Sequence, residues 1–128
     1  MRSVRVLDAA QAYEEISNGN LIWGDRGIGK TRALLRVIHD KHDGNVFVLF
    51  QSRELAKDAI RMYGEMFPDS VYFKAVSFRN AFIHGLDGIS IPVYADGLDR
   101  ARPRERAYIV DQVAAIFGIT GHELAGCL

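Results

Sequence analysis

The segment WGDRGIGKTRALL, residues 23–35, contains residue types that can bind phosphate groups, at the spacing that this chemistry requires. Gly24 is followed by four residues and then by Gly29, Lys30 and Thr31. Glycines allow successive backbone N–H groups to face one anion, and a helix that follows them points its positive end at the same place. Lys30 would reach the outer phosphates of a nucleoside triphosphate, while the Thr31 hydroxyl would ligate a magnesium ion between those phosphates. The spacing therefore predicts a site for ATP and Mg²⁺.

The predicted phosphate loop requires a strand before it and a helix after it, and both can be recognised in the sequence. Residues 21–23, LIW, form a short apolar run typical of a buried strand, and apolar residues recur at helical spacing over residues 31–39. Trp23 adjoins the loop and is expected to pack beneath it. The residues expected to contact the nucleotide are Gly24, Asp25, Arg26, Gly27, Ile28, Gly29, Lys30, Thr31 and Arg32.

Strand patterns and helix patterns alternate along the rest of the chain. Apolar runs at residues 46–50, 71–76 and 89–95 predict strands, and helical periodicity falls between them and again over about residues 103–117. We therefore expect an α/β fold in three layers, with a mostly parallel central sheet of about four to five strands. A single domain is expected over residues 1–128, with a leading helix in 1–19, a nucleotide-binding core in 20–100 and a C-terminal helix and tail in 101–128.

Composition restricts the environment and the partners. The chain carries 16 Lys and Arg against 16 Asp and Glu, so its formal net charge of zero offers no overall attraction to nucleic acid or to an anionic membrane. Contact with DNA or RNA would have to use a local patch. The single cysteine excludes an internal disulfide, and no apolar run reaches membrane-spanning length. We expect a protein of the cytoplasm with no membrane partner.

Together with its strand and helix, the segment 24–31 resembles the phosphate-binding loop of the P-loop NTPases. The resemblance implies the P-loop NTPase fold and a second hydrophobic strand that ends in an aspartate, the Walker B element. Residues 89–96, ISIPVYAD, fit this description. Asp96 is then the acid that holds Mg²⁺ together with Thr31, and Asp99 is the alternative.

Two strand and helix units lie between the loop and Asp96, an order similar to the RecA-like ATPase lobes of helicases and phage terminase motors, which have an added central strand. The resemblance covers roughly residues 20–100. Residues 46–60, VFVLFQSRELAKDAI, also resemble a helicase segment whose turn contacts the nucleic acid backbone, which makes Arg53 a candidate for that contact. The resemblance implies an ATPase of nucleic acid processing or packaging, with a phage-encoded protein in the host cytoplasm as one setting.

The sequence departs from these ATPases at the position after Asp96. Gly97 stands where they carry the glutamate that polarises the attacking water. Glu105 and Asp99 are the candidates that would reach the water from elsewhere. No strand with a γ-phosphate sensor is expected after the final helix. Hydrolysis is therefore expected to be slow, and to need a protein partner or self-assembly that completes the active site.

The arginine-rich segment at residues 97–107, GLDRARPRERA, has several interpretations. Its arginines form local ion pairs at a solvated helix start, contact nucleic acid phosphates, or supply an arginine finger. The segment also resembles the arginine-rich lid of small P-loop kinases. A nucleotide or nucleoside kinase and a regulatory module that senses nucleotide without hydrolysis therefore remain alternatives. The arginines taken as nucleic acid candidates are Arg100, Arg102 and Arg104.

Overall fold

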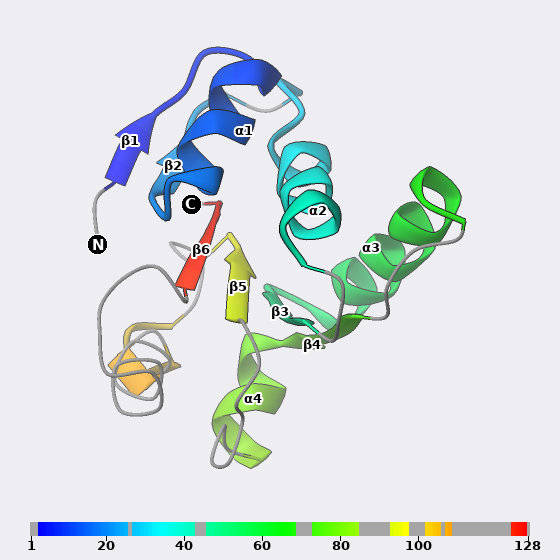
Figure 1. Ribbon diagram of the computed structural model, residues 1–128. Coiled ribbons are helices and arrows are strands. Elements are labelled where there is room, and N and C mark those ends of the chain that lie inside the picture. The colour runs from blue at the N-terminus through cyan, green and yellow to red at the C-terminus, as the bar shows by residue number, and fades with distance from the viewer. Residues whose placement is uncertain are drawn as a thin grey trace.

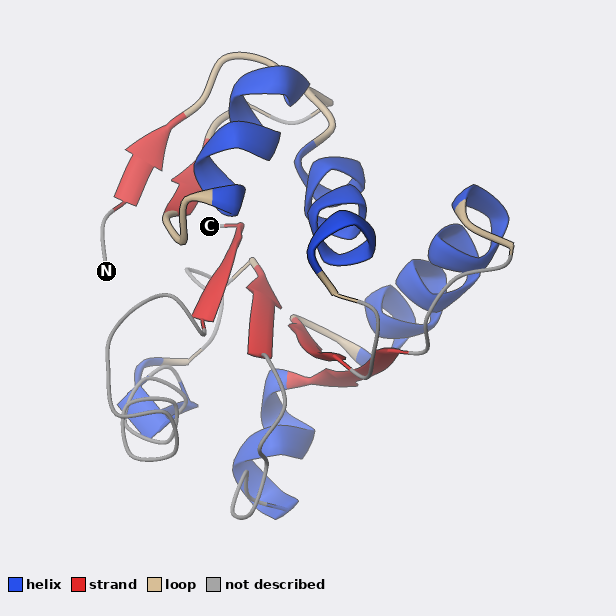
Figure 2. Cartoon of the chain, viewed as in Figure 1, coloured by secondary structure: helices blue, strands red, loops and turns tan. Residues whose placement is uncertain are grey.

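The computed structural model describes residues 3–25, 27–42, 46–68, 73–84, 93–97, 102–105, 107–108 and 124–127. Over these residues strands and helices alternate, as Figure 2 shows, so the expected α/β class is confirmed. The elements in chain order are β1 (Ser3–Arg5), α1 (Ala9–Ser17), β2 (Leu21–Trp23), α2 (Lys30–Lys41), β3 (Val46–Phe50), α3 (Arg53–Met66), β4 (Phe73–Ser77), α4 (Phe78–His84), β5 (Val93–Asp96) and β6 (Leu124–Cys127).

The strands form one six-stranded sheet in the order β1-β2-β6-β5-β3-β4, and its neighbouring strands pair in parallel. Two of these strands, β1 and β6, were not expected from the sequence, which predicted about four to five. The expectation that no strand follows the last helix is also wrong, because β6 lies between β2 and β5 (Figure 1). β6 joins what would otherwise be a pair, β1-β2, and a triplet, β5-β3-β4.

Helices cover both faces of this sheet. Figure 1 shows α1, α2 and α3 along one face and α4 on the other. The arrangement follows from the right-handed crossover of parallel units, because the chain moves across the sheet in one direction from β2 to β4 and reverses to reach β5. This reversal leaves an opening at the carboxyl ends of the central strands. In open α/β sheets, ligands bind at such an opening.

Short polar side chains begin the helices. The Asp8 carboxylate accepts a hydrogen bond from the Gln11 backbone N–H at 2.8 Å, and the Ser52 hydroxyl accepts one from Leu55 at 3.1 Å. These contacts satisfy backbone donors that have no partner within a helix. The leading helix expected within residues 1–19 is α1, and the short strand β1 precedes it.

The core lies between the sheet and the helices that flank the loop. All five residues of β3 are buried, in agreement with its continuous apolar character. On α2, Leu34, Leu35 and Ile38 are fully buried. The His39 ring of α2 stacks on the Phe67 ring after α3, with centroids 3.9 Å apart. α2 is therefore held at its place on the sheet.

The predicted final helix is described only at its beginning. Residues 103–105 and 107–108 are helical, and the rest of the predicted range lies outside the described residues. The same is true of residues 89–92 of the predicted fourth strand, which is described from Val93.

Candidate functional site

The carboxyl edge of the sheet places the candidate residues together. β2 ends at Trp23 and leads into Gly24, whereas β5 ends at Asp96. The neighbouring strand β3 leads into Gln51, and its pairing with β5 aligns Leu49 with Ala95. Residues that are distant in sequence therefore meet at one edge because parallel strands share a direction.

The loop after β2 needs its glycines for backbone reasons. Gly27 and Gly29 have φ values of 83° and 91°, a conformation that side chains disfavour, and Gly29 caps the N-terminus of α2. At Gly24 the reason is space, because an added Cβ would lie 2.5 Å from the Val6 carbonyl oxygen. The loop thus leads directly into the positive end of α2, the arrangement that suits an anion. Arg26 lies outside the described residues.

The Lys30 ammonium group lies over this loop. Its Nζ donates hydrogen bonds to the carbonyl oxygens of Gly24 and Asp25, both at 2.8 Å. The half-buried cation is therefore held at the mouth of the loop by its own backbone. A bound phosphate would offer these donors a charged acceptor, and hydrogen bonds to charged acceptors are the stronger ones.

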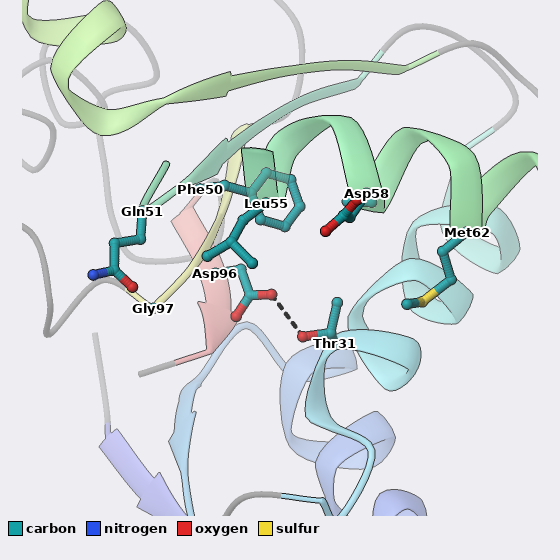
Figure 3. A pocket seen from close by; sticks show the side chains of 9 residues that line it. Thr31, Phe50, Gln51, Leu55, Asp58, Met62, Asp96 and Gly97 are labelled. Carbon is teal, nitrogen blue, oxygen red and sulfur yellow. Dashed lines mark hydrogen bonds between the residues drawn. The ribbon is translucent and has the colours of Figure 1, made fainter. Parts of the chain in front are cut away.

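Thr31 and Asp96 meet although 65 residues separate them in sequence. The Thr31 hydroxyl donates a hydrogen bond to the Asp96 carboxylate at 2.8 Å, as Figure 3 shows. Both groups are partly buried, and both provide the oxygen ligands that Mg²⁺ prefers. Within the described residues no group of three or more His, Cys, Asp or Glu side chains could hold a metal ion. The pair fits a Mg²⁺ ion that takes its other ligands from phosphates and water.

A cavity of about 480 Å³, the loop cavity, lies in front of the loop. Its cationic side chains are Lys30 and Arg32, and its carboxylate is Asp96. Two cations, a helix N-terminus and one acid suit a polyanion that arrives with a divalent cation. The loop cavity is lined by Gly27, Gly29, Lys30, Thr31, Arg32, Asp96 and Gly97.

A second cavity, the α3 cavity, opens on the other side of the Thr31–Asp96 hydrogen bond, with a volume of about 320 Å³. In Figure 3 the side chains of Asp58 and Met62 extend from α3 toward Thr31, while Gln51 and Gly97 lie at one end. The α3 cavity is lined by Thr31, Phe50, Gln51, Leu55, Asp58, Ala59, Met62, Asp96 and Gly97.

β5 is anchored behind the site by Tyr94. The Tyr94 hydroxyl and the His42 Nε2 form a hydrogen bond of 2.6 Å, which joins β5 to the residue after α2. Burial raises the pKa of Tyr94 to about 12. Tyr94 therefore stays neutral at physiological pH. Its hydrogen bond to His42 fixes β5, which ends in Asp96, relative to the end of α2.

Arg53 lies in a separate groove between α3 and the outermost strand β4. This edge groove has a volume of about 510 Å³, and Arg53 and Lys57, one helical turn apart, supply its charge. Its described lining contains no acidic side chain. The edge groove is lined by Arg53, Ala56, Lys57, Ile60, Ala75, Val76, Ser77 and Asn80.

Of the remaining predicted residues, those that the structure describes line neither the loop cavity nor the α3 cavity. Glu105 is buried, and its carboxylate accepts a hydrogen bond from the Arg102 backbone N–H at 3.4 Å. This contact caps the short helix there. Glu105 is absent from the described lining of both the loop cavity and the α3 cavity. Arg102 and Arg104 are exposed, and Arg100 lies outside the described residues.

Trp23 differs from the expectation. The expected packing beneath the loop is wrong, because the ring is 45% exposed and the Arg5 guanidinium lies over it, 5.4 Å from the centroid. Trp23 still adjoins the loop directly and is the single tryptophan of the chain.

Several residues of the α3 cavity, among them Leu55, Asp58 and Met62, were not singled out as site residues from the sequence. Leu55, Asp58 and Met62 follow one another at spacings of three and four, which places them on one face of α3. That spacing was visible in the sequence. Nothing local indicated that this face turns toward Thr31.

Within the described part of the chain, no helix combines the length and the apolar character that crossing a bilayer requires. Comparison with known proteins finds no matching family model, no similar curated protein and no similar solved structure.

Proposed function

We propose that the chain is an ATP-binding P-loop protein of the RecA-like type, which binds Mg²⁺ and ATP through residues 24–32 and Asp96. The observation that carries this proposal is the 2.8 Å hydrogen bond between Thr31 and Asp96. A hydroxyl at the start of the loop helix and an acid at the end of another strand are the two protein ligands that a P-loop magnesium site needs. Lys30 and the backbone of Gly27 and Gly29 would then hold the phosphates.

The strand order supports the RecA-like assignment. β6 lies between the loop strand β2 and the strand β5 that carries Asp96. The resemblance to helicase and terminase lobes implied an added central strand, and β6 is central in this sheet. The cytoplasm remains the proposed compartment.

Turnover in the isolated chain is proposed to be slow. The bound Mg²⁺ would neutralise charge that develops on the phosphates. Gly97 has no side chain that could orient a water, and Glu105 already caps a helix. The chain's own residues therefore bind and position the nucleotide better than they activate water. A partner or a second copy that supplies an arginine or an acid would raise the rate.

Nucleic acid is the proposed partner because of the edge groove. Arg53 and Lys57 lie next to each other along α3, and the described lining adds the polar side chains of Ser77 and Asn80 but no acid. Cations at this spacing can contact successive phosphates of a DNA or RNA backbone, which would give the local patch that a neutral chain requires.

The experiment that tests ATP binding replaces Lys30 with alanine. Titration of Mg²⁺ and ATP, followed by Trp23 fluorescence, should show binding to the wild-type protein. Loss of the ammonium group removes charged hydrogen bonds of about 1.5–3 kcal/mol, so affinity should fall by about 10- to 100-fold.

The matched control is Lys41→Ala at the other end of α2, where a lysine is exposed and far from the loop in sequence. Circular dichroism should show that both variants keep the fold. Equal ATP affinity of the Lys30→Ala and Lys41→Ala proteins would contradict the proposed site.

Steady-state assays then separate the two other interpretations. Phosphate release that DNA or RNA stimulates supports the ATPase. Transfer of phosphate to a small nucleotide or nucleoside supports a kinase, and tight binding without turnover supports a nucleotide sensor.

A further inference from the structure

The α3 cavity is larger and more apolar than a site for the attacking water needs to be. Its volume is about 320 Å³, whereas one water molecule occupies about 30 Å³ in the liquid. Phe50, Leu55 and Met62 form apolar walls, which give water few hydrogen-bond partners. A cavity of this size falls at the lower end of the range for small-molecule sites, of about 300–1,000 Å³.

The polar groups of the α3 cavity determine which chemical groups can bind in it. Asp58 and Asp96 contribute carboxylates, which accept hydrogen bonds from hydroxyl groups, whereas the apolar walls disfavour a charged ligand. Asp58 already faces a cation, because Arg61 lies 3.5 Å from it. Under the proposed function Asp96 faces Mg²⁺. A neutral group with a hydroxyl and an apolar ring therefore fits better than an anion or a further cation.

The α3 cavity and the edge groove are both lined by residues near the start of α3. Gln51 lines the cavity, and Arg53, two residues later, lines the groove. A nucleic acid strand whose phosphates contact Arg53 and Lys57 can thus turn around the N-terminus of α3. Its terminal nucleoside, which is neutral and carries a hydroxyl, then reaches the cavity.

We propose that the α3 cavity receives the terminal nucleoside of a nucleic acid strand and presents its free hydroxyl to the nucleotide in the loop cavity as a phosphate acceptor. This inference rests on the proposed function, and it names the substrate of the same site. The hydroxyl oxygen forms a bond to the terminal phosphorus of ATP while the bond from that phosphorus to the bridging oxygen breaks. The hydroxyl proton passes to the Asp58 carboxylate, and ADP leaves.

The test measures label transfer from γ-labelled ATP with Mg²⁺ to a short single-stranded DNA oligonucleotide with free hydroxyl ends. Labelled oligonucleotide is expected, whereas an oligonucleotide with phosphate at both ends should receive no label because it has no hydroxyl that could accept the phosphate. Leu55→Glu places a further carboxylate at the cavity and should reduce transfer by about tenfold or more. Fluorescence anisotropy should show that the oligonucleotide still binds, since Leu55 does not line the edge groove and Arg53 and Lys57 are retained.

The matched control is Ile83→Glu, which makes the same change at another exposed apolar residue. Ile83 is 60% exposed on α4, and Leu55 is 45% exposed on α3. Transfer by Ile83→Glu should equal that of the wild type, and Asp58→Asn should slow transfer while ATP affinity is retained.

Two results would overturn the inference: no label on the oligonucleotide, or equal transfer by the Leu55→Glu and Ile83→Glu proteins. Both are distinct from failure of the proposed function, because ATP binding and its loss in Lys30→Ala are measured without an acceptor. A protein that binds ATP and the oligonucleotide but transfers nothing keeps the proposed function and loses this acceptor site.

Discussion

At the scale of single residues, the site depends on one contact and on three glycines. Thr31 donates a hydrogen bond to Asp96 across 65 residues of sequence. Gly27 and Gly29 adopt a backbone conformation that side chains disfavour, and Gly24 lies against another segment of backbone. The contact and the glycines each allow us to predict the effect of a substitution.

Asp96→Asn should remove the magnesium dependence of ATP binding. The amide keeps the shape of the carboxylate but loses the charge that attracts a divalent cation, and Mg²⁺ affinity should fall by about tenfold or more. ATP titrations over a series of Mg²⁺ concentrations measure the effect. Asp25→Asn, an exposed acid in the loop, is the matched control. An unchanged magnesium requirement in Asp96→Asn would assign the metal to another acid.

Gly24→Ala should destabilise the fold by about 1–3 kcal/mol, because its Cβ would lie 2.5 Å from the Val6 carbonyl oxygen and the backbone must move. Gly64→Ala on α3 is the control, since an added Cβ there meets no atom within 4 Å. That change should stabilise the protein by up to about 1 kcal/mol, because alanine favours the helix. Urea unfolding measures both, and equal stability of the two variants would be inconsistent with the described loop.

At the scale of elements, α3 has two different functional faces. Leu55, Asp58 and Met62 line the α3 cavity, whereas Arg53 and Lys57 line the edge groove. The buried residues Ala56, Ala59 and Tyr63 hold α3 in place between the α3 cavity and the edge groove. One helix can therefore connect a candidate nucleic acid surface to the phosphate loop.

Arg53→Ala and Lys57→Ala should each weaken oligonucleotide binding without changing ATP affinity. Each cation that contacts a phosphate releases counterions, so each substitution should reduce the slope of log affinity against log salt by about one. Binding measured by anisotropy over several salt concentrations gives this slope. Arg36→Ala on α2, an exposed arginine outside the edge groove, should leave the slope unchanged. The groove assignment fails if all three variants behave alike.

At the scale of the whole molecule, β6 makes the sheet continuous. Its residues pair with β2 on one side and with β5 on the other, including Cys127 opposite Asp96. The phosphate loop follows β2 and the metal-binding acid ends β5, so β6 determines the separation of the two halves of the site.

Deletion of residues 124–128 should abolish cooperative unfolding. The backbone groups of β2 and β5 would lose their partners, at a cost of about 1–3 kcal/mol for each buried group left unpaired. Urea unfolding followed by circular dichroism tests this expectation, with deletion of Leu128 alone as the control. A shortened chain that unfolds as cooperatively as the full chain would show that the central position of β6 is wrong.

The local elements could be recognised from the sequence because their signals are local. The spacing from Gly24 to Thr31, the helical spacing of apolar residues after it, and the continuous apolar character of β3 each depend on neighbouring residues. Together they were sufficient for the α/β class. The loop spacing selected Thr31, and the resemblance to the P-loop NTPases selected Asp96, before any contact between them was known.

The order of the strands and the second cavity were decided only by the tertiary structure. The segment of β6, LAGC, has little strand character, and it becomes a strand because two neighbours offer it hydrogen bonds on both sides. Helical spacing grouped Leu55, Asp58 and Met62 on one face, but the crossover of α3 determined that this face meets Thr31. Contacts between distant segments depend on how the elements pack, and local periodicity carries no information about that packing.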